Sequence, residues 1–379
     1  MKLTLPVAAL VLYALVASRP VAAAPGDATR IMTSLDNPRG LTFAPNGALF
    51  VAESGHGGPL CVPGGGISCY GSTGAVTRYW HGEQVRVATG LPSLATAGGA
   101  QARGPNEIAL HGSGRAILTV GLEATASGRN TLGRDGLGWL VNIPGNALMA
   151  PASHLRTDEW SFDQDIAAYW DAPPLAKESD PFSILAVPGG FVMTDASANA
   201  LMEVDANGDL STIAFFPSRP DRTPINTDSV PTTVTVGPDG TYYVGEFLGF
   251  GQPLPAPGNA NVWRVVPGEA PHIFCSGWNR IIDIAFDDAG KLYVLEYATL
   301  ANATGPGTIW EVTPPPDPDS IDRTCPDRHR VATTGVSLVQ PTSIAFGPDG
   351  ALYVTNNGSR PPTPTGEFPF PGEVWRIER

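Results

Sequence analysis

The clearest copy of a pattern that this chain repeats is Pro231-Thr-Thr-Val-Thr-Val-Gly-Pro-Asp-Gly-Thr-Tyr-Tyr-Val-Gly-Glu246. A second clear copy is Pro341-Thr-Ser-Ile-Ala-Phe-Gly-Pro-Asp-Gly-Ala-Leu-Tyr-Val-Thr-Asn356. Weaker copies begin at Pro38, Pro105, Pro181 and Ile281. A pattern that returns at such intervals indicates a repeat architecture, in which every copy forms one supersecondary unit.

Each copy predicts a β-hairpin. The first apolar residue of a copy, called the anchor below, is followed six residues later by glycine, which tolerates the positive φ of a tight turn. Pro-Asn or Pro-Asp precedes this glycine in three copies and also favours a turn. The anchors are Leu41, Ile108, Ile184, Val234, Ile284 and Ile344. The turn glycines are Gly47, Gly114, Gly190, Gly240, Gly290 and Gly350.

A third strand follows every hairpin, and in most copies a fourth strand follows as well. The third strands are predicted at Ala75–Tyr79, Trp139–Ile143, Ala200–Val204, Val262–Val265, Ile309–Val312 and Val374–Ile377. Four antiparallel strands per repeat make a propeller blade, so the sequence predicts an all-β, six-bladed β-propeller. We expect an early strand at Arg30–Thr33 to complete the sixth blade, which closes the ring and removes exposed sheet edges.

The extra length of some repeats lies in insertions, of which residues 122–179 are the longest. Within it, Ser161 or Asp163 is expected to cap a short helix. The inward face of this helix is expected to hold Ile166, Tyr169 and Trp170. The helix would either pack against the rim of the propeller or cover the mouth of its channel.

Residues 1–23 have the features of an export signal. Lys2 precedes an apolar run from Leu3 to Val16, and small residues follow. We expect cleavage after Ala23 and a single propeller domain over residues 24–379. That domain would be secreted or periplasmic, would not insert into a membrane, and would meet an oxidising compartment.

Four cysteines remain after the export signal. Cys61 and Cys69 are close enough in sequence for a local disulfide, and Cys275 and Cys325 could pair across neighbouring repeats. The sequence has no C-x-x-C motif and no Cys/His spacing typical of zinc sites. We therefore interpret the cysteines as disulfide staples.

Charge and motifs exclude several classes of function. The chain has 23 Lys and Arg residues against 36 Asp and Glu residues, a formal net charge of −13. Such a surface repels nucleic acid and anionic membranes, so we expect neither as a partner. The sequence has no G-x-S-x-G, H-E-x-x-H, P-loop or G-x-G-x-x-G motif. Whether the chain is an enzyme stays open.

A ring of acceptor side chains is expected on one face of the disc. The first strand of a blade lines the central channel and the second strand returns, so the start of one and the end of the other meet around the channel mouth. The second strands end in Glu53, Asp195, Glu246, Glu296 and Asn356 in five copies. Either these residues accept backbone N–H bonds from adjoining turns, or some bind a cation such as Ca²⁺ or act as acid and base. His56, in the loop after Glu53, lies beside this ring.

The starts of the first strands line the mouth most directly. Two residues before the anchors stand Arg39, Asn106, Phe182, Thr232, Ile282 and Thr342. Glu107 and Asp283 follow one residue later in their copies, and Asn106 with Glu107 is the best polar pair. Glu107 could alternatively pair with Arg103 or Arg129.

Several segments of the sequence resemble the ScyD/ScyE family, which are secreted NHL-type propellers named after the scytonemin pigment cluster. They are Gly104–Leu110, Val230–Phe250, Ile282–Phe286 with Leu292–Glu296, and the Cys61–Cys69 loop that leads into Gly71–Arg78. The segment from Val230 to Phe250 is the most specific. The resemblance covers nearly the whole chain after the export signal and implies export and a propeller fold. The family has no settled catalytic residues to transfer.

A wider resemblance links the chain to six-bladed SMP-30/gluconolactonase-like, regucalcin and paraoxonase-like hydrolases. Those proteins bind a divalent ion with Glu, Asn and Asp around the first-strand mouth. In this sequence only Asn106 stands at the matching offset.

The leading hypothesis is an extracytoplasmic propeller that binds a small molecule or a peptide at the channel mouth. The candidate binding residues are Arg39, Glu53, His56, Asn106, Glu107, Glu246, Asp283 and Glu296. An alternative is a metal-assisted hydrolase or lyase that uses Glu107 and holds Ca²⁺ with Asn106, Glu246 and Glu296. A third hypothesis is a protein-interaction scaffold on the propeller face.

Overall fold

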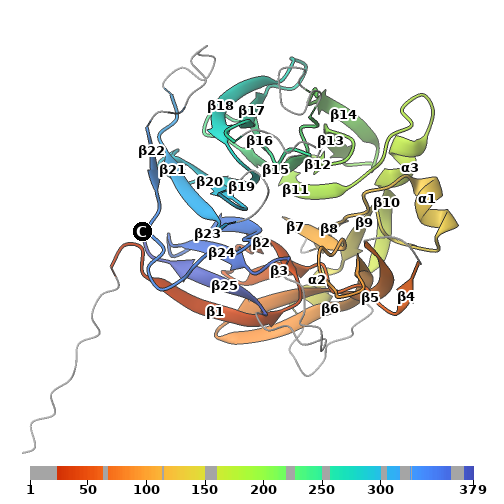
Figure 1. Ribbon diagram of the computed structural model, residues 1–379, viewed down its shortest axis with the longest axis horizontal. Coiled ribbons are helices and arrows are strands. Elements are labelled where there is room, and N and C mark those ends of the chain that lie inside the picture. Colours follow the sequence, from red (N-terminus) through yellow and green to blue (C-terminus); the bar gives the residue numbers. More distant parts are fainter. Residues whose placement is uncertain are drawn as a thin grey trace, which may run out of the picture.

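Strands such as Leu49–Glu53 and Leu292–Glu296 are buried at successive positions, which point to opposite faces of the sheet. Both faces therefore need cover, and packing the sheets radially provides it. The computed structural model has six antiparallel sheets around a central axis (Figure 1). It describes residues 24–62, 67–112, 115–149, 160–218, 227–249, 257–299, 305–315, 325, 327–359 and 371–379. The predicted six-bladed β-propeller is confirmed. The expected export signal and the turn glycine Gly114 lie outside the described residues.

The first two blades carry the longest insertions, and blade 3 has the basic repeat length. Blade 1 consists of β2 (Pro38–Phe43), β3 (Leu49–Glu53), β5 (Ile67–Trp80) and β6 (Glu83–Thr96), with the short β4 (Leu60–Cys61) paired to β5. Blade 2 consists of β7 (Pro105–His111), β8 (Arg115–Val120), β9 (Trp139–Ile143) and β10 (Ser161–Asp165). Blade 3 consists of β11 (Pro181–Val187), β12 (Gly190–Asp195), β13 (Ala200–Asp205) and β14 (Leu210–Phe215).

In the last three blades, blade 4 has the basic repeat length and blade 5 carries a shorter insertion. Blade 4 consists of β15 (Pro231–Val236), β16 (Tyr242–Glu246), β17 (Ala260–Val265) and β18 (His272–Trp278). Blade 5 consists of β19 (Ile281–Phe286), β20 (Leu292–Glu296), β21 (Thr308–Val312) and β22 (Arg328–Arg330). Blade 6 consists of β23 (Ser343–Phe346), β24 (Leu352–Asn356), β25 (Gly372–Ile377) and β1 (Ala28–Leu35). The predicted third strands are all found.

The sixth blade joins early and late parts of the chain, as predicted. Strand β1 pairs antiparallel with β25, and Met32 faces Val374 in this pairing. Both side chains are buried. The early strand therefore closes the ring and leaves β25 without a free edge.

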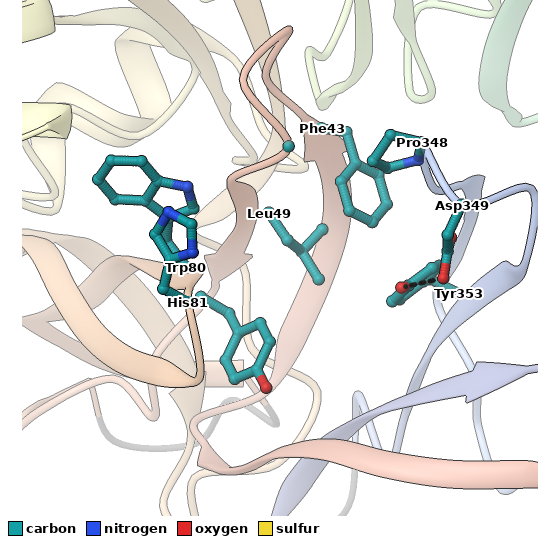
Figure 2. Close-up of a pocket in the computed structure, with 9 residues that line it drawn as sticks. Phe43, Leu49, Trp80, His81, Pro348, Asp349 and Tyr353 are labelled. Atoms are coloured by element: carbon teal, nitrogen blue, oxygen red, sulfur yellow. Dashed lines mark hydrogen bonds between the residues drawn. The ribbon is translucent and has the colours of Figure 1, made fainter.

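Aromatic pairs recur where one blade packs on the next. A tyrosine of one blade meets a phenylalanine of the following blade edge to face, with ring centroids 4.8 or 5.0 Å apart. The pairs are Tyr243–Phe286 at junction 4/5, Tyr293–Phe346 at junction 5/6 and Tyr353–Phe43 at junction 6/1. Figure 2 shows the last of these pairs. The hydrophobic core thus lies between blades, because each sheet buries its faces against its neighbours.

The hairpin turn of blade 3 differs from the prediction. Gly47, Gly240, Gly290 and Gly350 have positive φ as expected, but in blade 3 the left-handed residue is Gly189, with φ of 92°. Gly190 instead begins β12 and pairs with Val187. Two adjacent glycines allow a shorter turn here, which moves the left-handed position back by one residue.

The predicted helix of the long insertion exists, but its cap was misplaced. Helix α3 (Ile166–Asp171) is capped by Asp165, whose side chain accepts a hydrogen bond from the Ala168 amide at 3.0 Å. Ser161 and Asp163 lie in β10, because the insertion supplies the outer strand of blade 2 before the helix begins.

Helix α3 packs on the rim and does not cover the channel. Ile166 and Trp170 are fully buried against residues of blades 2 and 3, while Tyr169 is partly buried. Two further short helices are α1 (Ala126–Thr131) and α2 (Gly145–Leu148). Arg129 of α1 forms a bidentate ion pair with Asp165, at 2.7 and 2.8 Å, so its carboxylate partner is not Glu107.

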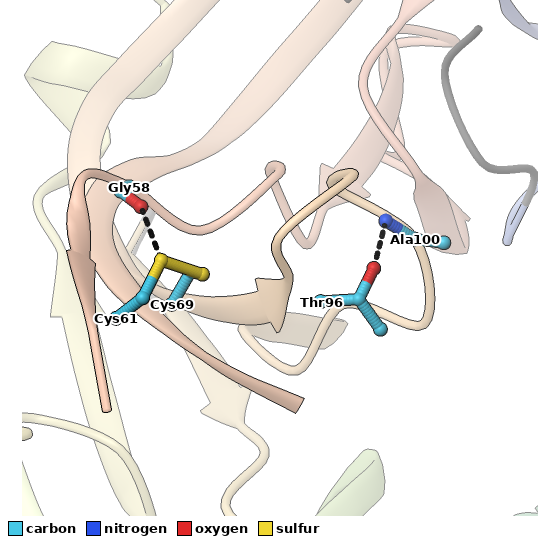
Figure 3. Close-up of a disulfide and its surroundings, with 5 residues drawn as sticks. All are labelled: Gly58, Cys61, Cys69, Thr96 and Ala100. Atoms are coloured by element: carbon cyan, nitrogen blue, oxygen red, sulfur yellow. Dashed lines mark hydrogen bonds between the residues drawn. A yellow bond between two sulfur atoms is a disulfide. The ribbon is translucent and has the colours of Figure 1, made fainter. Parts of the chain in front are cut away.

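Two disulfides are formed, with the predicted partners. Cys61 and Cys69 join β4 to β5 (Figure 3). Cys275 of β18 is bonded to Cys325, which lies beyond β21, so this bridge links blades 4 and 5. Within the described ranges, no helix is long and apolar enough to cross a membrane.

Candidate functional site at the channel mouth

Side chains two residues before the anchors tie neighbouring inner strands together. The Asn106 amide donates to the Pro181 carbonyl oxygen at 2.9 Å, and the hydroxyls of Thr232 and Thr342 donate to the equivalent carbonyls of Ile281 and Pro38. All three side chains are buried. Asn106 thus joins blade 2 to blade 3, and its amide nitrogen is already used by the chain.

Asp283 joins three blades from one position in the channel. Its carboxylate accepts hydrogen bonds from the Thr233 hydroxyl at 2.6 Å, the Ser343 hydroxyl at 2.7 Å, and the amides of Ile284 and Ile344 at 2.8 Å. These donors belong to β15, β19 and β23. Burial raises the pKa of Asp283, and the four donors act against that rise.

Glu107 stands at the same repeat position as Asp283 and in the opposite blade of the ring. Its carboxyl group occupies space that only glycine leaves open, since a Cβ added at Gly40 would lie 2.2 Å from it. The Ile108 amide donates to it at 3.0 Å. Burial raises the pKa of Glu107 well above its ordinary value, and the nearby Asp283 carboxylate adds to the effect. Glu107 therefore tends to hold a proton.

Two arginines reach the mouth on the side of blades 1 and 2. Arg39 donates from Nε to the Ser54 hydroxyl at 3.1 Å and from Nη2 to the Ala102 carbonyl at 2.6 Å. No described residue accepts a hydrogen bond from its Nη1. Arg103 is held by a backbone bridge to Leu94, with both hydrogen bonds at 2.7 Å.

The carboxylate partner of Arg103 is Glu123, not Glu107. The Glu123 side chain is about half exposed, so the pair lies at the solvent side of the mouth. The sequence could not distinguish these partners, because Glu123 enters the mouth from the loop after β8. The pairing that we considered for Glu107 with Arg103 or Arg129 is therefore wrong in both forms.

Asp180 and Tyr297 complete a group that we call the mouth cluster, together with Arg39 and Arg103. Burial raises the pKa of Asp180, and both arginines oppose this rise. Burial lowers the pKa of Arg103 to about 10 and also lowers that of Arg39, whose charge is favoured by Tyr297 and Asp180. Sequence reasoning missed Asp180 and Tyr297, although each lies directly beside a repeated position.

An apolar wall lies next to the mouth cluster. Phe182, Phe247 and Ile282 belong to one hydrophobic cluster with Tyr297. The rings of Phe247 and Tyr297 meet edge to face at 5.5 Å. Tyr297 therefore links Arg39 to the apolar wall, and the mouth combines hydrogen-bond donors with aromatic surface.

The acceptors at the ends of the second strands point into their own blades. Glu246 accepts from the Ser229 hydroxyl at 2.6 Å, from the Asn261 amide at 2.5 Å and from the Trp263 indole at 2.9 Å. Glu296 accepts from the Asn279 amide at 2.8 Å and the Trp310 indole at 2.9 Å.

Two further acceptors of this ring repeat the arrangement. Glu53 forms a bidentate ion pair with Arg86 and accepts from the Asp36 amide at 2.6 Å. Asp195 accepts from the Asp180 amide at 2.8 Å and the Ser179 hydroxyl at 2.6 Å, and burial raises its pKa to about 6. These contacts match the role of fixing adjoining turns.

The fifth acceptor, Asn356, binds the segment before β23. Its side-chain oxygen accepts from the Val339 amide at 2.7 Å, and its Nδ2 donates to the Ser337 carbonyl at 3.2 Å. His56 lies at the surface beyond β3, where its Nδ1 pairs with Asp36. That hydrogen bond raises the pKa of His56.

The residues considered for a metal site do not converge. Asn106, Glu246 and Glu296 share no hydrogen-bond partner, and each binds groups of the chain itself. Among the residues that the structure describes, no group of three or more His, Cys, Asp or Glu side chains could hold a metal ion. This donor set does not fit a Ca²⁺ ion, and we derive no step through one.

No family model matches the chain, and no curated protein matches it. Solved structures with the same fold include a Thermus thermophilus protein assigned as an oxidoreductase (glucose dehydrogenase), at TM-score 0.56 and 16% identity, covering 92% of this chain and 99% of that one. A PQQ-bound aldose sugar dehydrogenase from Streptomyces coelicolor is similar at TM-score 0.52 and 11% identity, over 94% and 100% of the chains.

A protein assigned as a gluconolactonase is similar at TM-score 0.50 and 13% identity, over 95% of this chain and 96% of that one. At these identities the likeness concerns the fold. The structural neighbours of this chain are therefore gluconolactonase-like and glucose dehydrogenase-like propellers.

Proposed function

We propose that this chain is an exported, ScyD/ScyE-like propeller that binds a small molecule at the channel mouth. The ligand would carry a planar ring and a hydrogen-bond acceptor such as a carboxylate or a carbonyl group. The observation that carries the proposal is the contact of the mouth cluster with an apolar wall, through Tyr297. Export and membership of the family rest on residues 1–23 and on the segments quoted from the sequence.

The mouth cluster supports binding of an acceptor. Arg39 keeps one guanidinium nitrogen without a described partner, and burial disfavours its charge. A carboxylate that accepts from this nitrogen would offset the desolvation of the guanidinium. The aromatic wall of Phe182 and Phe247 would bury the ring of the same ligand.

The experiment titrates phenylacetate into the exported protein, residues 24–379, and follows saturation-transfer NMR. Phenylacetamide and cyclohexylacetate serve as probes that lack the charge and the planar ring. We expect the affinity for phenylacetate to fall at least about fivefold in Arg39→Gln and in Phe247→Leu. Arg330→Gln, an exposed arginine on β22, is the matched control.

Equal binding of phenylacetate to Arg39→Gln and Arg330→Gln would contradict the proposal. Equal binding of all three probes would show that the mouth does not select for a ring with an acceptor. Mass spectrometry of the protein recovered from a secreting host tests export, with an amino terminus at Ala24 expected.

A further inference from the structure

The blade junctions carry a second, independent feature on the opposite face of the disc. At this face the first and second strands of each blade are joined by their turns. Three junctions share a tyrosine–phenylalanine pair, but the pair is covered differently at each of them. This comparison within one chain indicates which chemical group the pair accepts.

At junction 4/5 the pair is covered by an aromatic side chain. The Phe274 ring packs edge to face on Tyr243 with centroids 4.9 Å apart. Tyr243 also contacts Phe286 at 5.0 Å. The chain itself fills this position with an apolar group.

At junction 5/6 the pair is covered by a guanidinium group. The Arg379 guanidinium carbon lies 4.9 Å from the Tyr293 ring centroid and 4.8 Å from that of Phe346. Its Nη2 donates to the Asp287 carboxylate at 2.5 Å and to the Tyr293 hydroxyl at 2.7 Å. Two aromatic rings and one carboxylate therefore bind a cation here.

At junction 6/1 the pair borders a cavity. Phe43 and Tyr353 form the pair, and the cavity has a volume of about 180 Å³. Figure 2 shows Trp80 and His81 on one side of it and Phe43, Pro348, Asp349 and Tyr353 on the other. The Tyr353 hydroxyl donates to Asp349 at 3.1 Å, so a carboxylate borders this cavity as well.

The strand registers explain why this junction lacks the cation of its neighbour. Leu49 pairs with Tyr79 in blade 1, and Leu352 pairs with Ile377 in blade 6. His81 lies two residues after Tyr79, and Arg379 lies two residues after Ile377. His81 and Arg379 therefore occupy the same position of the repeat. The His81 ring stacks on Trp80 at 4.5 Å, at a residue with φ of 52°. His81 and Gly82 form the two-residue turn between β5 and β6, which requires positive φ at both residues.

Both junctions carry carboxylates together with basic side chains. Around junction 5/6, Asp287 and Glu311 face Lys291, which leaves a net charge of −1. At junction 6/1, Asp349 and Glu378 face Arg376, which also leaves −1. Arg78 also lies over Trp80 and adds a positive charge, and its buried guanidinium donates to the Leu148 carbonyl. The cavity is thus bordered by the Asp349 carboxylate, which pairs with Arg376 as Glu378 does.

We propose that the cavity at junction 6/1 binds a guanidinium group from outside the chain, the arginine side chain of a peptide. Its planar guanidinium would stack on the rings of Phe43 and Tyr353, and its nitrogens would donate to Asp349, in the way that Arg379 stacks and donates at junction 5/6. A planar guanidinium suits this site better than an ammonium group, because it stacks on rings and binds a carboxylate at once. The site is independent of the function proposed for the channel mouth.

The test uses N-acetyl-arginine methylamide as the probe and its citrulline analogue as the neutral isostere. Protein with ¹³C-labelled phenylalanine rings reports binding at Phe43 by NMR. We expect saturable shifts at Phe43 with the arginine probe and at least about tenfold weaker binding of the citrulline probe. Equal shifts with both probes would overturn the proposal.

Two variants exchange the properties of the junctions. His81→Arg should fill the cavity from within and weaken probe binding at Phe43 at least about tenfold. Arg379→Ala should uncover Tyr293 and Phe346, so the probe should then also shift the Phe346 ring. Unchanged probe binding in His81→Arg, with circular dichroism like that of the wild type, would overturn the proposal. Absence of a new Phe346 shift in folded Arg379→Ala would do the same, because the two junctions would then not bind the same chemical group.

Discussion

Carboxylates inside the blades and carboxylates in the channel come from repeated positions of one pattern, yet the chain surrounds them differently. Inside blade 4, Glu246 accepts hydrogen bonds from three side chains. In the channel, the Ile108 amide is the donor that the described residues offer to Glu107. A carboxylate that its own blade saturates with donors fixes that blade, whereas one with few donors, such as Glu107, has a raised pKa and can take a new partner.

Asp283 shows that donor number matters more than position. It stands at the same repeat position as Glu107, but four donors from three neighbouring strands surround it. Serine and threonine at the equivalent positions of blades 4 and 6 supply two of these donors. The small hydroxyl residues of the channel are therefore part of what holds the inner strands together.

The largest expected effect comes from emptying a saturated position. Glu246→Ala removes the common acceptor of the buried donors Ser229, Asn261 and Trp263. We expect a loss of about 3–5 kcal/mol in the free energy of unfolding, measured by urea denaturation at pH 7. The control is Glu203→Ala, at an exposed position of β13, which should cost below about 0.5 kcal/mol. Equal midpoints for the two variants would show that Glu246 does not hold its blade together.

A smaller, pH-dependent effect is expected for Glu107→Gln. The folded state raises the pKa of Glu107, so its contribution is fully present below the unfolded value near 4.3 and is lost as pH rises through the folded value. Glutamine cannot ionise and should remove this loss. We therefore expect the variant to be more stable than wild type at pH 8, by about 1 kcal/mol, and to match it near pH 4.

Thermal melting across this pH range checks the prediction for Glu107. Parallel curves for wild type and variant would mean that Glu107 is ionised in the folded state and that the channel does not protect its proton. That result would also remove the contrast with Glu246, because the surrounding groups of the chain would then stabilise both carboxylates equally well.

The blades could be predicted from the sequence because the features that mark each hairpin lie close together in the chain. Alternating apolar residues and a turn glycine mark each hairpin, and the residues around the first and last anchors complete one repeat. The exact turn residue Gly189 and the helix cap Asp165 could not be predicted. Either of two adjacent glycines can take the left-handed turn position, and any of three nearby acceptor side chains can cap the helix. Such choices depend on the strand to which the segment pairs.

The candidate site was less predictable, because a repeated position gives the place of a side chain and not its direction. Glu246 and Glu296 were correctly placed at the ends of second strands, but tryptophans of the third strands, Trp263 and Trp310, draw them into the blades. Asp180 and Tyr297 escaped notice because they lie next to repeated positions and meet Arg39 only across blades. The cavity at junction 6/1 required two strand registers to be compared.

The smallest expected effect concerns His56, whose imidazole pairs with Asp36 at the surface. This hydrogen bond raises the pKa of His56, so the stability that it contributes is present below the ordinary value near 6.5 and is lost as pH rises through the folded value. The His56 side chain is 45% exposed, and solvent screening keeps the effect of His56→Gln below about 1 kcal/mol. An NMR titration of the imidazole proton should give a lower midpoint in Asp36→Asn than in wild type. An unchanged midpoint would mean that Asp36 does not stabilise the charged imidazole. The Asp36 carboxylate would then resemble Glu107 of the channel, which has few hydrogen-bond partners.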